Sequence, residues 1–163
     1  MVAIESGTGL FAEVIAGTWR WLSPDDQTSA GTAIDTPDGL VLIDPPSMPD
    51  AMQHRASRVA AVLLTSVVNA REASSWRSRG VPVWAPVASD GMAPASVDHP
   101  FDPDRAPALP GGLRVGALPI AGVTGDAPEV AYLWNVALPA AAGVPSSAWM
   151  LATGASFPVA GQT

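Results

Sequence analysis

Residues 59–65 read Val-Ala-Ala-Val-Leu-Leu-Thr, and this stretch decides the fold class. A run this apolar predicts a strand that is covered on both faces, as strands of parallel sheets usually are. After it, Asn69 and Glu72 stand at capping-box spacing and predict a helix over residues 69–79. Residues 81–86 predict the next strand. This order indicates an α/β protein in which strands 40–44, 59–65 and 81–86 belong to one sheet, with a right-handed crossover if the last two are parallel neighbours.

The residues before this unit predict a β-hairpin and a helix. Two β-rich runs, Ser29–Asp35 and Leu40–Asp44, are joined by Thr36-Pro37-Asp38-Gly39. Proline fixes φ at the second position of a turn and glycine accepts a positive φ, so this tetrapeptide predicts the hairpin turn. Residues 47–58 predict a helix with Pro49 in its first turn, where the missing N–H costs nothing. Residues 10–22 predict extended chain.

The residues after this unit predict a second group of strands. Residues 88–110 are rich in proline and predict a surface excursion with little regular structure. Within it, residues 98–104 gather three aspartates and His99, which we interpret as a solvated acidic loop, with a metal site as the alternative. Beyond it, three strands are expected: Leu113–Leu118, Val130–Leu138 and Trp149–Thr153.

Composition bounds the class of protein. The chain has 163 residues, 48% of them hydrophobic, which predicts a single domain over 1–163. Eight basic residues, all arginine, stand against 15 acidic ones, for a net charge of −7. The basic patch of a nucleic-acid binder and the Lys/Arg-rich face of a membrane-surface protein are missing. Cysteine is absent, which excludes disulfides and thiolate metal sites and leaves the redox compartment open. The first residues do not resemble a signal peptide, so we expect a cytoplasmic protein.

Several short segments, in order, resemble the metallo-β-lactamase fold superfamily, whose members form an αββα sandwich. The segments are Gly39-Leu40-Val41-Leu42-Ile43-Asp44-Pro45, Val62-Leu63-Leu64-Thr65, Gly80-Val81-Pro82-Val83-Trp84-Ala85, Gly112-Leu113-Arg114-Val115, Gly122-Val123-Thr124 with Glu129-Val130-Ala131-Tyr132-Leu133, and Leu151-Ala152-Thr153-Gly154. The resemblance implies an α/β, metallo-β-lactamase-like sandwich. Members of the superfamily continue further after the Thr-Gly pair, so it also implies a C-terminally shortened form.

The resemblance also identifies the positions at which enzymes of the superfamily bind one or two metal ions. Those enzymes place a His-x-His-x-Asp-His cluster directly after the strand that ends here in Thr65. The six equivalent positions hold Ser66, Val68, Ala70, Arg71, Val123 and Ala155. Zinc needs at least three good N, O or S donors, and valine and alanine supply none. We therefore expect no bound metal and no cofactor, and no catalytic residue is predicted.

A vestigial pocket is implied where the metal ions would lie. Its predicted lining is Ser66, Asn69, Arg71, Thr124, Asp126 and Ser156. Two interpretations are open. Arg71 holds a small polar or anionic ligand, or these side chains hydrogen-bond to one another and fill the space, because buried polar groups must be satisfied in either case.

Two classes of function follow from the sequence. The first is a non-catalytic protein of this fold that acts through self-association or through a protein partner or small polar ligand. The second is a hydrolase-like enzyme of the same superfamily with an altered metal site. Few elements cover the second group of strands, so an open face or edge predicts a homodimer. The alternative is a monomer in which residues 88–110 cover that face.

Overall fold

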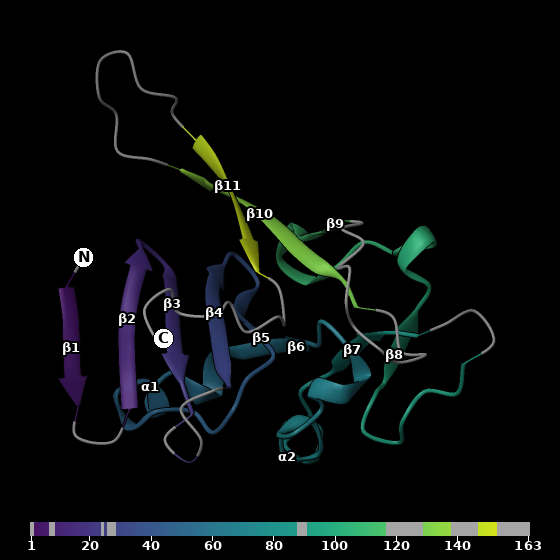
Figure 1. Ribbon diagram of the computed structural model, residues 1–163, viewed down its shortest axis with the longest axis horizontal. Helices are drawn as coiled ribbons and strands as arrows, with labels where there is room; N and C mark the ends of the chain where they lie inside the picture. The colour runs from purple at the N-terminus through teal and green to yellow at the C-terminus, as the bar shows by residue number, and fades with distance from the viewer. Residues whose placement is uncertain are drawn as a thin grey trace, which may run out of the picture.

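The computed structural model describes residues 2–6, 9–23, 25, 29–87, 91–116, 129–137 and 147–152, and they form two sheets (Figure 1). The large sheet has eight strands in chain order: β1 (Val2–Ser6), β2 (Gly9–Ile15), β3 (Thr18–Leu22), β4 (Ala30–Thr36), β5 (Gly39–Ile43), β6 (Val59–Leu63), β7 (Val83–Pro86) and β8 (His99–Phe101). Strands β1 to β5 pair antiparallel, and β5 to β8 pair parallel. The predicted neighbours β5, β6 and β7 are thus confirmed as members of one sheet.

The small sheet contains the three strands expected from the last third of the chain. They are β9 (Arg114–Gly116), β10 (Ala131–Ala137) and β11 (Ser147–Ala152), in the order β11-β10-β9 and all antiparallel. Strand β10 lies in the middle and begins close to the end of β6, because Val130 N–H donates to the Thr65 carbonyl at 2.8 Å.

Two apolar clusters lie on opposite faces of the large sheet and define its layers. One includes Leu42, Val62 and Leu64 of the sheet with Met52 and Trp76 from the helices that cover this face. The other lies between the two sheets. It consists of residues of both sheets and of the segments next to the small-sheet strands, which are Ile34, Val41, Ile43, Leu63, Phe101, Leu109, Leu113, Val130, Tyr132, Trp134, Val136 and Ala152. Strand β6 faces both clusters, as its unbroken apolar sequence predicts. The described layers are therefore helices, large sheet and small sheet.

The hairpin turn is confirmed, but both helices are shorter than predicted. Gly39 follows the turn with φ of +129°, a value that L side chains rarely adopt. The first helix is limited to α1 (Asp50–Gln53), followed by a 3₁₀ turn at Ala56–Arg58. The second, α2, spans Ala73–Ser78 and not residues 69–79. Among the described residues no helix is long and apolar enough to cross a membrane.

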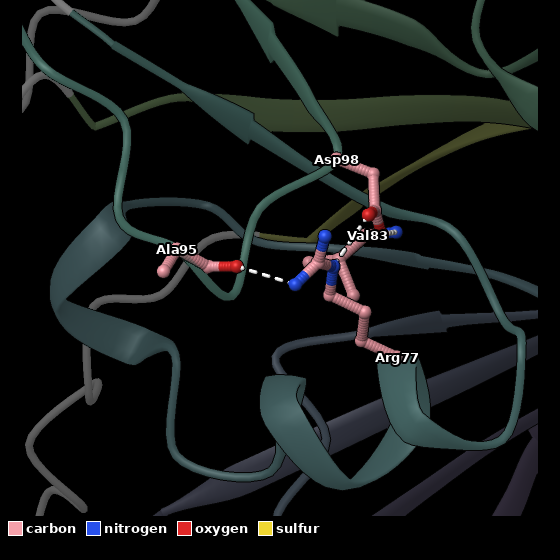
Figure 2. Close-up of polar contacts among 4 residues, drawn as sticks. All are labelled: Arg77, Val83, Ala95 and Asp98. Carbon is pink, nitrogen blue, oxygen red and sulfur yellow. Dashed lines mark hydrogen bonds and ion pairs between the residues drawn. The ribbon is translucent and has the colours of Figure 1, made fainter.

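The prediction of a solvated acidic loop over residues 98–104 was wrong for residues 99–101, which form a strand. His99–Phe101 form β8, which pairs in parallel with β7 at the edge of the large sheet, and the His99 ring stacks on Trp84 with centroids 4.2 Å apart. The Asp98 side chain links α2 to β7 (Figure 2). Its carboxylate accepts a hydrogen bond from Arg77 Nε and another, at 3.0 Å, from Val83 N–H. The Arg77 hydrogen bond holds the pKa of Asp98 below its usual range. The sequence around β8 is rich in proline and has no alternation of apolar and polar residues, so it gave no signal for this short strand.

The contact between Gly31 and Trp21 fixes the packing between β3 and β4. A Cβ atom at Gly31 would lie 2.5 Å from the Trp21 ring and 2.7 Å from Pro46 Cδ, and Trp21 is only 1% exposed. We expect Gly31→Ala to lower the free energy of unfolding by about 2 kcal/mol, because an overpacked core must shift backbone or rotamers. Urea unfolding measures this. The control is Gly80→Ala. A Cβ atom at Gly80 would meet no atom within 4 Å, but the residue has φ of +81°. This substitution should therefore lower the free energy of unfolding by about 1 kcal/mol through backbone strain alone. Equal losses would contradict the packing argument.

Candidate functional site

The candidate site lies where β5 and β6 end side by side. The two strands are parallel neighbours, so Asp44, which follows β5, stands next to Thr65, which follows β6. Asp44 has a left-handed backbone with φ of +44°, the one positive φ among the described non-glycine residues. A non-glycine residue in that region carries some strain, and such strain occurs often at functional or structurally constrained positions.

The Asp44 carboxylate binds the loop after β6 through both oxygen atoms. Oδ1 accepts from the Thr65 backbone N–H at 2.8 Å. Oδ2 accepts from the Thr65 hydroxyl at 2.5 Å and from Asn69 Nδ2 at 3.2 Å. Asn69 Nδ2 also donates to Thr65 Oγ1 at 2.9 Å. These three side chains thus form a closed network that sets the path of residues 65–69, where a 3₁₀ turn (Val67–Asn69) begins.

The predicted capping box does not form. Asn69 ends the 3₁₀ turn (Val67–Asn69), and its Nδ2 donates to Asp44 and Thr65. The residue before α2 is Glu72, whose side chain makes no capping hydrogen bond. The helix therefore begins four residues later than the capping-box spacing predicts, at Ala73.

The small sheet closes the site from the other side. The Tyr132 hydroxyl on β10 donates to the Leu64 carbonyl at 2.6 Å, and Tyr132 is fully buried. Glu129 lies just before β10 and close enough to Asp44 for their charges to interact. The end of β6 is thus held between the Asp44 network and two hydrogen bonds from the start of β10.

Burial controls the protonation of these groups. Desolvation raises the pKa of Asp44 from 3.8 to about 7, the hydrogen bonds from Thr65 and Asn69 oppose that rise, and the Glu129 charge adds to it. Desolvation also raises the pKa of Glu129. The pKa of Tyr132 is raised well above 10 by desolvation and by the Asp44 charge, so its hydroxyl stays protonated as a donor.

Removing the Tyr132 hydroxyl tests this connection between the sheets. We expect Tyr132→Phe to lower the free energy of unfolding by about 1–2 kcal/mol, because the buried Leu64 carbonyl then has no donor. Chemical denaturation of the variant and of the wild type gives the difference. A change below about 0.5 kcal/mol would mean that the hydrogen bond contributes nothing net to stability.

The structure places only some of the predicted pocket residues. Ser66 is 3% exposed, and Asn69 lies in the Asp44 network, whereas Arg71 is exposed on the same loop. Thr124, Asp126 and Ser156 lie outside the described residues, as do Val123 and Ala155. Sequence reasoning missed Asp44, Glu129 and Tyr132 as parts of the site. The available signal was a lone carboxylate directly after an apolar strand, beside a second strand that ends in threonine.

The side chains on the loop after β6 do not fit a zinc ion. Val68 is 71% exposed, and Ala70 carries only a methyl group. Arg71 adds a positive charge that disfavours a cation. Within the described part of the chain, no three His, Cys, Asp or Glu side chains lie together as a metal-binding group. The donors required for a tetrahedral zinc site are not assembled by the described residues.

Comparison with known proteins identifies the fold. A solved structure described as a B3 metallo-β-lactamase with an active-site glutamic acid matches with a TM-score of 0.55 at 19% sequence identity, covering 86% of this chain and 60% of that one. A metallo-β-lactamase from Erythrobacter litoralis matches over 52% of this chain and 42% of its own, also at 19% identity, with a TM-score of 0.38. No family model and no curated protein matches the sequence.

The chain therefore has the metallo-β-lactamase fold, and it spans 60% of the length of the first of these structures. The expected fold class is confirmed. At 19% identity the likeness establishes the fold alone, so activity must be argued from this chain's own residues.

Proposed function

We propose that this protein is a non-catalytic member of the metallo-β-lactamase fold that has lost the metal site and acts through self-association or through binding a partner or ligand. One observation carries the proposal. The loop that presents metal ligands in enzymes of this fold here presents Ser66, Val68, Ala70 and Arg71, and Asp44 and Asn69 hold it in place. The polar groups at this end of the sheet are used to hold the loop.

The hydrogen bonds of Asp44 explain why we assign it a structural role. A general base must present a free lone pair to its substrate within hydrogen-bond reach. Three of the four lone pairs of the Asp44 carboxylate already accept hydrogen bonds, two from Thr65 and one from Asn69, and these bonds orient the carboxylate toward the loop after β6. Nucleophilic use of Ser66 would need an oriented base. His54 and His99, the chain's two histidines, lie in other segments, on the turn after α1 and on β8.

A small anion is the ligand class that this loop would favour. Arg71 supplies the positive charge, and it is exposed on a loop whose shape is set by partly buried hydrogen bonds. A guanidinium group recognises carboxylate and phosphate groups through paired N–H donors. The proposed pocket also includes Ser66, Asn69, Thr124, Asp126 and Ser156, of which the last three lie outside the described residues.

The alternative is a hydrolase-like enzyme with an altered metal site. The observation in its favour is that Asp44 and Glu129 are two carboxylates whose charges interact. A zinc ion bound by both would still need at least one further donor, and could then lower the pKa of a bound water toward 7. The neighbour described as having an active-site glutamic acid gives this alternative its precedent.

Hydrolysis assays separate the two proposals. The purified full chain is incubated with a β-lactam and with a thioester, each with added Zn²⁺ and, separately, with a chelator. We expect product formation equal to that of buffer in every case. Hydrolysis that the chelator abolishes, and that Glu129→Gln reduces while the exposed-site control Asp104→Asn does not, would instead establish the altered enzyme.

A further inference from the structure

The strands at the edges of a sheet need protection, because their unpaired N–H and C=O groups can pair with another chain. In the described part of the chain, four strands lie at sheet edges: β1, β8, β9 and β11. Three of them carry the usual protection. Strand β8 has three residues, one of which is Pro100; β9 has three residues and begins with Arg114; and β1 contains Glu5.

Strand β11 lacks all of these protections. It has six residues, Ser-Ala-Trp-Met-Leu-Ala, without a charge or a proline. Its neighbour β10, Ala-Tyr-Leu-Trp-Asn-Val-Ala, is also uncharged. All six β11 residues pair with β10, so its other edge is open among the described residues. A long, uncharged edge of this kind readily pairs with a further strand.

Part of this ribbon is only two strands wide. Strand β9 pairs with β10 only from Ala131 to Leu133, whereas β11 pairs with β10 from Tyr132 to Ala137. The β10–β11 pair therefore continues beyond β9, and Figure 1 shows it extending away from the large sheet. A two-stranded ribbon in water is marginally stable, and a third strand adds hydrogen bonds and cross-strand contacts. The extended part of the ribbon would thus gain most from a partner strand.

Charge limits where two copies of the chain can meet, and this edge is such a place. Each copy carries a net charge of −7, so contact between two copies is repulsive over most of their surface. The β10–β11 ribbon contains no charged residue, and two copies can meet there without placing like charges opposite each other. Antiparallel pairing of one strand with its own copy also satisfies twofold symmetry, the commonest symmetry of protein dimers.

We propose that β11 pairs antiparallel with β11 of a second copy about a twofold axis near Trp149 and Met150, which joins the two small sheets into one six-stranded sheet. This inference rests on the self-association part of the proposed function. It names the strand that carries that association.

Cysteine cross-linking tests the proposed pairing, because the chain contains no cysteine of its own. Single variants Ala148→Cys, Trp149→Cys, Met150→Cys and Leu151→Cys are oxidised in the folded protein. Opposed residues of two paired strands have Cα atoms about 5 Å apart, which lies within the range of a disulfide. The matched control is Asn135→Cys, because Asn135 is the register partner of Trp149 on β10. In the proposed dimer the two β10 strands lie about 14 Å apart, too far for a disulfide.

The expected result has three parts. The wild type sediments at twice 16.6 kDa at micromolar concentration. Among the four β11 variants, the one whose cysteine lies nearest the twofold axis cross-links roughly tenfold faster than Asn135→Cys. Amide exchange of residues 147–152 in the unmodified chain slows as concentration rises, while that of β8, another edge strand, stays constant. This last measurement needs no substitution and stands if a variant fails to fold.

The outcomes separate this inference from the proposed function. A dimer without preferential β11 cross-links or concentration-dependent protection of residues 147–152 would overturn the β11 pairing and leave self-association intact. A monomer over the whole concentration range would overturn both the pairing and self-association. The hydrolysis assays would then test separately whether the protein is non-catalytic. Higher ionic strength should tighten the dimer, because it screens the repulsion between two copies of charge −7.

Discussion

Replacing Asp44 by alanine is expected to lower the free energy of unfolding by about 3 kcal/mol at pH 6. The substitution removes the acceptor for the Thr65 N–H, the Thr65 hydroxyl and the Asn69 amide. An unsatisfied buried donor costs roughly 1–3 kcal/mol, and the remaining bond between Asn69 and Thr65 limits the total. Urea unfolding of the variant and the wild type, followed by tryptophan fluorescence, measures the loss.

The control for this experiment is Asp104→Ala. Asp104 is exposed, and its backbone N–H rather than its side chain makes the hydrogen bond to Asp102. A surface substitution of this kind changes stability by about 0.5 kcal/mol or less. Equal effects of the two substitutions would show that the Asp44 network does not hold the loop after β6.

The second large effect is a dependence of stability on pH that Asp44→Asn removes. Burial raises the pKa of Asp44 in the folded chain to about 7 from 3.8. Between these two values the folded state keeps the proton that the unfolded chain has lost. Stability therefore falls as pH rises through this window, and the loss is complete above about pH 7. Asparagine has a similar shape and cannot ionise.

The comparison of wild type and Asp44→Asn isolates this carboxyl from the others. Asp98 contributes in the opposite direction, because its lowered pKa gives stability that is lost only on acidification. The wild type and the variant both contain Asp98, so its contribution cancels in the comparison. As pH rises from 4.5 to 8, we expect the unfolding free energy of the wild type to fall by about 3 kcal/mol relative to that of Asp44→Asn. Parallel pH profiles would mean that Asp44 ionises normally in the folded chain.

Local sequence signals predicted the elements that local chemistry determines. The turn Thr36-Pro37-Asp38-Gly39 contains its own conformational restrictions, and the apolar run of β6 requires cover on both faces. Strands β1 and β8 were not predicted, and one segment was predicted without its turn. Strand β8 is three residues long and includes proline. The predicted extended segment over residues 10–22 is in fact two strands that turn at Gly17, with φ of +76°.

The site shows the limit of sequence reasoning more clearly. Asn69 and Glu72 have the spacing of a capping box, but α2 begins only at Ala73, and the contact between Asn69 and Asp44 depends on tertiary structure that the local sequence does not show. Asp44 itself is one carboxylate among 15 acidic residues. Its partner Thr65 is 21 residues away in the sequence, and the two meet because β5 and β6 are adjacent and parallel. Arg71, by contrast, was identified from the family resemblance, and its role remains a prediction.

Zinc binding by the purified full chain tests the central claim most directly. The protein is stripped of metal, dialysed against micromolar Zn²⁺ at pH 7.5, separated from free ion and analysed for metal content, beside Glu129→Gln and Asp44→Asn. The proposal of a lost metal site predicts that the wild type retains far less than one equivalent of zinc, and no more than the two variants retain. Retention of one or two equivalents by the wild type, and its loss in the two variants, would contradict the proposal and assign Asp44 and Glu129 as metal ligands.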